Sequence, residues 1–497
     1  MNSTKILVLM IGNIIGYLFD LLYFMLSRIY FDIEVIGAFG IIFSYFSIFS
    51  FILTFGFSVT YLKLHGETIN IEEKAITNGT FLFFRAIQFL AYALIGFILI
   101  PFFNIKHIDF TEFLLFFIGF LFANFSYQIF SQLLITQKRI FTKSLILTTS
   151  LILKNILLIS LIRFFKPNLK LLVSIYLIIN FLYFFIYLIS LSQIKIKMPN
   201  KETINKFIKN SYLMIITSSL LAILGNIDVI LISNTFTIKD VANYFTAKQI
   251  FNYFIALITG IHFLLIPVFS KNIKLDNGNE NLETIKKIHK YFNIIIVFLA
   301  CLIILYSIDV IILFFGEKYK TTAVILSILS IGFIMISINF GKNIHLRALG
   351  ENSFYSILLI FEYFISLIIL IIFISPLFLN LGPIGAAFSL VFAHIITQLI
   401  TRPIIYKKYG IGFYWGVFRN VLIMISIILL HIYVLNIYFN SIIFIPVFII
   451  FDAVLYFVIN YLTRGYNKED IKFFFNIIRF KTIKKSILSE LGSIKKK

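Results

Sequence analysis

The chain has 497 residues, of which 60% are hydrophobic and only 13% are charged. A soluble domain is typically about half apolar and about a quarter charged, so this composition excludes a large soluble domain and indicates a polytopic membrane protein. The formal net charge of +21 also occurs in nucleic-acid-binding proteins. Most Lys and Arg residues, however, fall in connectors on one side of the apolar runs, as in cytoplasmic loops. We therefore expect no nucleic acid partner, and we expect both termini in the cytoplasm.

Fourteen apolar runs have the length of a membrane-spanning helix, for which a hydrocarbon core ~30 Å thick requires about 20 residues. They lie at 6–31, 36–62, 80–103, 111–135, 144–165, 169–192, 212–235, 248–269, 292–315, 321–341, 354–379, 383–405, 416–436 and 441–462. The eight prolines lie at or near the ends of these runs, so we expect few sharply broken helices. The sequence thus predicts an all-α integral membrane protein with about 14 transmembrane helices.

Two stretches of the chain follow the same plan. In residues 212–270, two spans are joined by the short connector TIKDVANYF, and near the N-terminus two spans are joined by DIEVIGAFG. Such internal repeats are typical of membrane transporters. We predict an N-lobe of spans one to six (1–195), a cytoplasmic linker (196–211), a C-lobe of spans seven to twelve (212–408), spans thirteen and fourteen (409–465), and a basic amphipathic cytoplasmic tail (466–497). The two lobes should be pseudo-symmetric.

Polar residues inside the spans recur on single helical faces. Examples are Asn13, Gly16, Asp20 and Ser27 in span one, Asn124, Gln128, Ser131 and Gln132 in span four, and His394, Thr397 and Thr401 in span twelve. Lipid cannot satisfy such groups, so they should face water or other helices. The pattern leaves two interpretations open, a shared polar cavity or hydrogen bonds that tie neighbouring helices together.

Three charges of the first half lie within predicted spans: Asp20, Arg85 and Lys154. A charge inside the bilayer is costly, so we expect these residues to have a use. Two cations and one acid predict a cavity of positive potential that attracts an anion. As substrate-binding candidates we take Lys154, Arg85, Gln88, Asn124 and Gln128. A packing role remains the alternative, in which Asp20 forms an ion pair with Arg85 or Lys154, or Arg85 reaches the headgroups.

The second half carries Asp228 in span seven and Glu362 in span eleven, without an equally central Lys or Arg. An uncompensated carboxylate is protonated or binds a cation, so we predict Asp20, Asp228 and Glu362 as ion-coupling residues for H⁺ or Na⁺. We interpret His394 and the other histidines near spans as core or interfacial residues rather than proton relays. Hydrolase, metalloprotease and nucleotide-binding motifs are absent from the sequence, so we expect no enzyme activity, no metal site and no other cofactor.

Several segments resemble the Wzx-type polysaccharide flippases. They are SRIYFDIEVIGAFGIIFSYFSIFSFILTFGFSVTYLKL at 27–64, LLAILGNIDVILISNTFTIKDVANYFTAKQIFNYFIALITGIHFLLIPVFSK at 220–271, NIHLRALGENSFYS at 343–356 and LGPIGAAFSLVFAHIITQLI at 381–400. The resemblance implies membership of the multidrug/oligosaccharidyl-lipid/polysaccharide (MOP) exporter superfamily. It also implies a MATE-like fold of two six-helix lobes around a central cavity, with two extra C-terminal helices.

The activity that this resemblance implies is the transfer of an undecaprenyl-diphosphate-linked oligosaccharide from the cytoplasmic to the outer leaflet of the bacterial inner membrane. It implies the lipid-linked oligosaccharide as substrate, membrane lipid, and polysaccharide polymerase and chain-length proteins as partners. Two alternatives within the superfamily are a cation-coupled multidrug antiporter and a lipid II flippase. The chain lacks the Pro-kinked acidic motif expected of the first and the arginine-rich first span expected of the second. A membrane polysaccharide polymerase or ligase is a further alternative, although its long outward loop is missing here.

Overall fold

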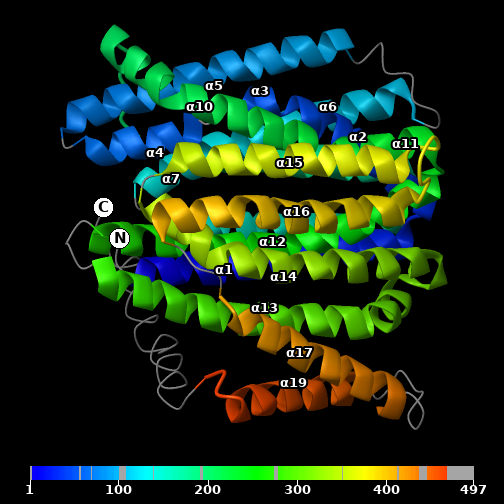
Figure 1. Cartoon of the computed structure of the whole chain (residues 1–497). Coiled ribbons are helices and arrows are strands. Elements are labelled where there is room, and N and C mark those ends of the chain that lie inside the picture. The colour runs from blue at the N-terminus through cyan, green and yellow to red at the C-terminus, as the bar shows by residue number, and fades with distance from the viewer. Residues whose placement is uncertain are drawn as a thin grey trace. The chain divides into compact units, whose positions relative to one another are not determined.

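The computed structural model describes residues 3–54, 57–68, 70–99, 108–137, 139–190, 194–273, 278–349, 351–410, 414–435 and 445–466. Within these ranges every regular element is a helix, so the predicted all-α class is confirmed (Figure 1). Eight of the described helices are long and apolar enough to cross a membrane, and four shorter apolar segments accompany them. The count of fourteen spans stays a prediction, and the predicted amphipathic tail lies outside the described residues.

The chain forms two compact units that divide between Ala242 and Asn243. The helices of the first unit are α1 (Ser3–Tyr30), α2 (Ile33–Phe49), α3 (Phe51–Thr54), α4 (Phe57–Glu67), α5 (Ile71–Leu99), α6 (Phe110–Phe125), η2 (Ser126–Phe130), α7 (Ser131–Thr136), α8 (Ile140–Ile162), α9 (Leu169–Ser190), α10 (Lys201–Leu224) and α11 (Ile227–Thr235). Helix α12 (Ile238–Ile273) begins in the first unit and continues into the second. The predicted lobe boundaries at 196–211 stay a prediction.

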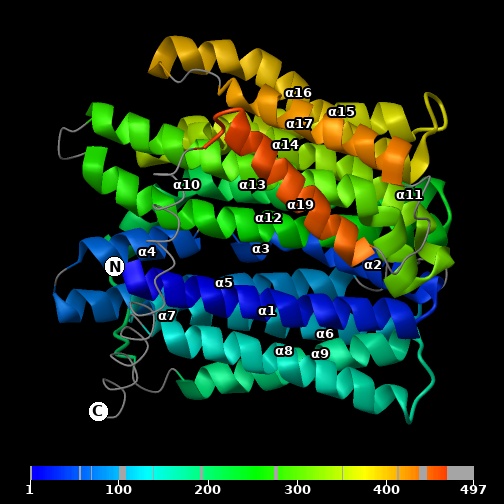
Figure 2. The same cartoon turned by 90° about the horizontal axis from the view of Figure 1, so that it is seen from below.

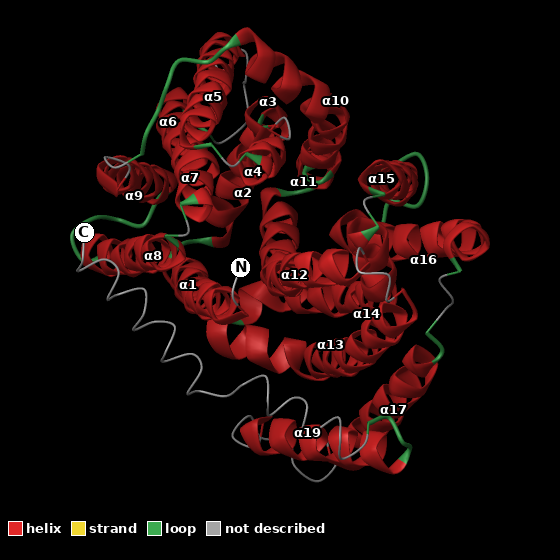
Figure 3. Ribbon diagram, turned by 90° about the vertical axis from the view of Figure 1, so that its left-hand side faces the viewer, coloured by secondary structure: helices red, strands yellow, loops and turns green. Residues whose placement is uncertain are grey.

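The second unit contains the remaining helices. They are α13 (Gly278–Phe315), η3 (Glu317–Tyr319), α14 (Lys320–Ala348), α15 (Asn352–Ile374), α16 (Gly382–Tyr409), α17 (Gly416–Leu430), η4 (His431–Leu435) and α19 (Ile445–Leu462). Helix α16 packs against both α14 and α15, while α13 packs against α14 and α17 (Figure 3). The three helices α14, α15 and α16 therefore share an interior within this unit.

Aromatic side chains fill the core of the first unit between α2, α5, α6 and α9. The Phe116 ring is fully buried and stacks on Tyr176, with 4.8 Å between ring centroids. Phe46 lies 5.6 Å from Phe116 and accepts, through its carbonyl, a 3.1 Å hydrogen bond from the Tyr92 hydroxyl. Helix–helix association in lipid depends on close packing rather than on water exclusion, so interlocked rings are a suitable core.

Several helix ends follow local rules. The Asn200 side chain accepts a 2.8 Å hydrogen bond from the Thr203 amide and starts α10 as an N-cap. Helix α16 ends at Gly410, whose φ of 66° lies in the left-handed region that favours glycine. Helix α16 thus ends at Tyr409, close to the predicted span end at 405, whereas α10 already begins at Lys201, well before the predicted span start at 212.

Two predicted spans are interrupted by residues other than proline. The span expected at 36–62 has a turn at Ser50 between α2 and α3. The span expected at 212–235 is divided at Gly225 and Asn226, and the Asn226 side chain donates back to the Ala222 carbonyl at 3.0 Å. The expectation of few sharp breaks rested on the placement of proline; at these two positions Ser50 and Asn226 interrupt the helix through side-chain bonds to nearby backbone carbonyls.

The two repeated connectors are largely helical and contact each other. DIEVIGAFG forms the first turns of α2, and TIKDVANYF forms the first turns of α12. A Cβ on Gly37 would lie 2.2 Å from the Ile238 carbonyl oxygen, so only glycine fits at this contact. The exposed Lys239 ammonium lies 3.3 Å from Glu34 beside it. The two copies of the repeated connector therefore touch each other through their backbones.

Candidate functional site

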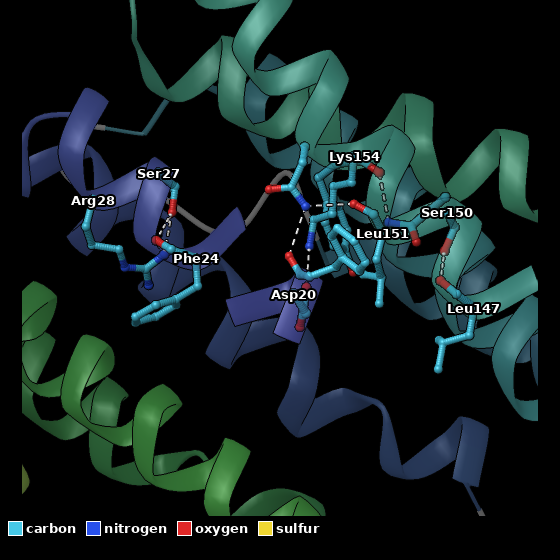
Figure 4. A network of polar contacts seen from close by, with 12 residues as sticks. Asp20, Phe24, Ser27, Arg28, Leu147, Ser150, Leu151 and Lys154 are labelled. Carbon is cyan, nitrogen blue, oxygen red and sulfur yellow. Dashed lines mark hydrogen bonds and ion pairs between the residues drawn. The ribbon is translucent and has the colours of Figure 1, made fainter. Parts of the chain in front are cut away.

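An ion pair joins α1 and α8 in the first unit. Lys154 Nζ lies 3.0 Å from Asp20 Oδ1, and the two side chains are 16% and 28% exposed (Figure 4). The ammonium also lies 3.8 Å from the centroid of the Tyr23 ring, a cation–π distance. Next to it, Asn155 Nδ2 donates to the Phe19 carbonyl at 2.9 Å. The predicted substrate residue Lys154 and the predicted ion-coupling residue Asp20 therefore belong to one cluster.

The sequence brings these groups together through helical spacing. Asp20 and Tyr23 are three residues apart and share one face of α1. On that side, a Cβ on Gly16 would lie 3.1 Å from Leu147, so glycine allows α1 to approach α8 closely (Figure 2). Close approach of the helices lets the Lys154 chain reach the Asp20 carboxylate.

Arg28 is a buried cation that the sequence analysis missed. It lies in the last turn of α1 and is only 4% exposed. Its guanidinium donates to Ser27 Oγ at 2.7 Å and lies 3.6 Å from the centroid of the Phe24 ring (Figure 4). The signal was available, because positions 24, 27 and 28 continue the α1 face that carries Asp20.

Arg85 of α5 forms hydrogen bonds to both pieces of the interrupted second span, α3 and α4. Its side chain is 3% exposed and donates to the Leu53 carbonyl of α3 and to the Ser58 hydroxyl of α4. It also donates to Gln88 Oε1 at 3.0 Å, so these two predicted substrate residues do contact each other. A carbonyl at a helix end lacks an intrahelical donor, and the guanidinium supplies one inside an apolar region.

The other predicted residues of this half lie in different surroundings. Asn124 donates to the Phe120 carbonyl of its own helix at 3.0 Å. Gln128 belongs to the π-helical segment η2, and its side chain lies outside the described residues. Asp228 is 5% exposed in the first turn of α11, where its Oδ1 accepts a 2.8 Å bond from the Val229 amide. A carboxylate suits that position because the helix N-terminus is electropositive.

In the second unit, Glu362 of α15 contacts His394 of α16. The carboxylate oxygen Oε1 lies 2.6 Å from His394 Nδ1, and the side chains are 17% and 19% exposed. Lys342 of α14 is 5% exposed and lies within electrostatic range of Glu362. The sequence analysis found no equally central Lys or Arg in this half, and Lys342 lies at the end of its predicted span rather than at its centre. Lys342 was missed because it follows the last apolar residue of its span and was assigned to a loop.

A second buried acid of this unit belongs to the C-terminal helices. Asp452 of α19 is 1% exposed, accepts a 2.5 Å hydrogen bond from the Tyr306 hydroxyl, and lies 3.3 Å from His431 Nδ1. Asp452 thus ties α19 and η4 to α13.

Comparisons with known proteins place this geometry in a recognised architecture. Neither the protein-family models nor the curated protein sequences contain a match. Among solved structures, the lipid II flippase MurJ in an inward closed conformation superposes with a TM-score of 0.73 at 18% identity, over 92% of this chain and 98% of MurJ. An inward-facing MATE multidrug resistance transporter of the MOP superfamily gives 0.64 at 16% identity, over 80% of this chain and 96% of its own. A MOP superfamily transporter from Pyrococcus furiosus gives 0.58 at 14% identity, over 82% and 96%.

The chain has the MATE-like fold. That fold, shared with MurJ, was expected from the sequence and is confirmed. These three structures are a lipid II flippase and two MOP superfamily transporters, and an identity of 14–18% to this chain shows a shared fold but not a shared substrate. Within this MATE-like chain, the residues described above give two polar regions: the Asp20–Lys154 cluster in the first unit and the Lys342, Glu362 and His394 group in the second.

Proposed function

We propose that this chain is a transporter that flips a lipid-linked, phosphate-bearing oligosaccharide across the bacterial cytoplasmic membrane by alternating access. The observation that carries the proposal is the structural likeness to MurJ, a lipid II flippase, over almost the whole of both chains. The MATE transporter covers a smaller share of this chain, which favours a lipid-linked substrate over a drug. The Wzx-type segments favour an undecaprenyl-diphosphate-linked repeat unit of a surface polysaccharide.

In this proposal Lys154 is the cation that meets the diphosphate. Its ammonium is half-buried in a helix interface, where a second anion would compete with Asp20 for it. Because Asp20 and Lys154 form one pair, binding of the diphosphate to Lys154 would release the Asp20 carboxylate to accept a coupling ion. Substrate binding and ion binding would then be linked through a single contact. Arg85 and Gln88 would act by positioning α3 and α4 rather than by direct contact.

The coupling ion, H⁺ or Na⁺, is assigned to Asp20, Asp228 and Glu362. All three are partly or fully buried acids in apolar helices, where a bare charge is unfavourable. We propose no metal cofactor and no enzymatic step. The partners in this proposal are the membrane lipid, a polysaccharide polymerase and chain-length proteins, and both termini lie in the cytoplasm.

The second candidate is a lipid II flippase of peptidoglycan synthesis. The structural likeness to MurJ favours it directly. Arg28 also adds a buried cation to the first span, which the sequence analysis had considered poor in arginine.

The two candidates differ in the intermediate that a strain without this gene accumulates. If the chain flips a polysaccharide repeat unit, this strain should accumulate the undecaprenyl-diphosphate-linked repeat unit on the cytoplasmic side. It should grow normally and lack surface polysaccharide. The lipid II reading expects lipid II to accumulate and growth to stop. Normal levels of both intermediates would contradict the proposed function.

A further inference from the structure

Three buried polar side chains meet where the C-terminal helices pack against α13. Tyr306 belongs to α13, His431 begins the π-helical segment η4, and Asp452 belongs to α19. They are 3%, 6% and 1% exposed, and all three lie within the second unit. We call them the Asp452 cluster. π-Helical segments are rare and frequently occur at functional sites, and the proposed function gives this cluster no role.

The polar atoms of the Asp452 cluster converge on one carboxylate oxygen. Asp452 Oδ2 accepts a hydrogen bond from the Tyr306 hydroxyl at 2.5 Å and lies 3.3 Å from His431 Nδ1. The same Nδ1 lies 3.4 Å from the Tyr306 hydroxyl oxygen, and the two rings meet edge to face with 5.2 Å between centroids. Because the Tyr306 proton points at Asp452, a bond between His431 and the carboxylate requires a further proton between Nδ1 and Oδ2.

No fixed cation accompanies the Asp452 carboxylate. Among the residues that the structure describes, no Lys or Arg lies within electrostatic range of it. Cys301 and Asp309 of α13 lie near the cluster, and neither side chain can be positive. Arg419 of α17 lies within range of a tyrosine one turn further along α19 instead. His431 is therefore the group that can balance the carboxylate, and it does so only when it binds a proton.

The other buried acids of the two polar regions differ in this respect. Asp20 has Lys154 at 3.0 Å, and Glu362 has Lys342 within electrostatic range. A lysine supplies its positive charge at neutral pH whether or not anything else binds. A buried carboxylate without such a partner is costly, so Asp452 depends on a proton for its charge balance.

The second carboxylate oxygen of Asp452 gives independent support. Oδ1 is buried and has no hydrogen-bond partner among the described residues. By contrast, the Tyr456 hydroxyl on the same helix donates to the Ile294 carbonyl of α13 at 3.0 Å. An unsatisfied oxygen costs more free energy when it carries charge than when the carboxyl group is neutral. The surroundings of Asp452 therefore favour a proton on the pair over a bare carboxylate.

The chemistry of the cluster suits a proton better than a metal ion. Hard cations are held by several oxygen ligands, whereas the cluster offers one carboxylate and one hydroxyl. Among the described residues, no group of three or more His, Cys, Asp or Glu side chains could hold a metal ion. Histidine, in contrast, ordinarily gains and loses its charge near neutral pH.

We propose that Asp452 and His431 form a proton-binding site, with Tyr306 as the residue that positions the carboxylate. Uptake of one proton by the carboxylate and the neutral imidazole takes the pair from one negative charge to none, and the proton is held between Oδ2 and Nδ1. Release leaves a bare carboxylate in an apolar interior, so it requires water to reach the cluster as α19 moves away from α13. The inference goes beyond the proposed function, which assigns coupling ions to other acids.

Nitrogen NMR of the full-length protein in lipid bilayers, with ¹⁵N in its histidine side chains, tests this site directly. The chain has seven histidines, and the signal of His431 is the one that His431→Gln removes. We expect this signal to change reversibly between the neutral and the proton-loaded imidazole across about pH 5 to 9. A signal that stays the same over this range in the folded protein would indicate a purely structural contact and overturn the proposal.

Asp452→Asn keeps the shape of the side chain and removes its charge. We expect it to shift the pH midpoint of the His431 signal by at least about one unit, a tenfold change in proton affinity. The matched control is Tyr456→Phe, which removes another polar contact between α19 and α13 and should leave the midpoint unchanged. If Asp452→Asn fails to fold, Tyr306→Phe decides, because it removes a hydrogen bond from the same carboxylate. Equal midpoints in wild type and in the cluster variants would overturn the proposal.

Sodium distinguishes a proton site from a metal site. Replacing choline by Na⁺ at constant pH should leave the His431 midpoint unchanged. A shift with Na⁺ that Asp452→Asn abolishes would assign the site to sodium and overturn the proposal. None of these measurements uses a transported substrate, whereas failure of the proposed function appears as normal levels of lipid-linked intermediates in a strain without the gene. The two ideas can therefore fail independently.

Discussion

The two units differ in the partners of their buried charges. In the first unit, Lys154 is matched by Asp20 at 3.0 Å, and Arg85 is bonded to the broken second span. In the second unit, Lys342 lies within electrostatic range of Glu362, whose carboxylate contacts His394 at 2.6 Å. The sequence analysis expected a positive cavity in the first half and carboxylates without an equally central cation in the second half. The comparison teaches that the partner of a buried cation decides how a substrate can reach it: Lys154 would become available when an anion competes with Asp20, whereas Arg85 stays bonded to the second span.

The largest effect should come from Arg85→Leu. This change removes the donors that the Leu53 carbonyl and Ser58 hydroxyl receive inside an apolar region. Loss of a buried charged partner typically costs about 3 kcal/mol or more, so we expect little folded protein. The measurement is the yield of monodisperse protein and its Tm, with Arg85→Lys as the intermediate control. A variant that folds normally and fails only in transport would move Arg85 into the substrate site and weaken the contrast between the units.

The next effect should come from Lys154. We expect Lys154→Ala to abolish surface polysaccharide while protein levels stay normal, because the diphosphate loses its cation. Lys154→Arg should be milder, since the charge remains. The readout is surface polysaccharide beside an immunoblot of the membrane fraction. Normal polysaccharide in the Ala variant would remove Lys154 from the mechanism.

A double variant separates packing from transport at the same pair. Asp20→Asn with Lys154→Gln keeps a hydrogen-bonding pair and removes both charges. If the pair only joins α1 to α8, the double variant should regain both Tm and transport relative to Lys154→Ala. We expect Tm to recover and transport to stay absent. Recovery of both would show that the first unit's charges serve packing alone.

Asp228→Asn should change stability less than the variants above, but it should stop gradient-driven transport. The Asn side chain keeps an oxygen that accepts from the Val229 amide, so stability should change by less than about 1 kcal/mol. Substrate binding should persist, while transport driven by an imposed H⁺ or Na⁺ gradient in proteoliposomes should stop. Glu362→Gln is the matched change in the second unit. Unchanged gradient-driven transport in Asp228→Asn would reject its coupling role.

The smallest effect should come from the exposed pair Glu202 and Lys206 on α10, whose charged atoms lie 2.6 Å apart. Surface ion pairs contribute little because water screens them and both side chains lose freedom. Glu202→Gln should therefore leave Tm and transport unchanged within error. A marked loss of Tm or of transport would mean that exposed charges also contribute to stability or function. A comparison limited to buried charges would then be incomplete.

The sequence predicted the parts of the fold that depend on composition and period. Apolar runs predicted helices, and the alternative in which Asp20 pairs with Lys154 followed from their shared depth. It did not predict the breaks at Ser50 and at Gly225 and Asn226, because Ser and Asn also occur inside helices without ending them. At the first break Arg85 in addition donates to the Leu53 carbonyl, a tertiary contact that hydropathy does not show. Lys342 was missed because hydropathy ends a span at the first charge, whereas burial by neighbouring helices continues beyond it.

The glycine contact between the repeated connectors has a practical consequence for following this protein during its cycle. Gly37 lies so close to the Ile238 carbonyl that α2 and α12 touch backbone to backbone. Glu34 and Lys239 flank this contact with their side chains exposed to solvent. Cysteines placed at these two positions would therefore form a short cross-link only while the connectors stay together. Comparing the extent of cross-linking with and without a transmembrane gradient would show whether the two connectors separate during the transport cycle.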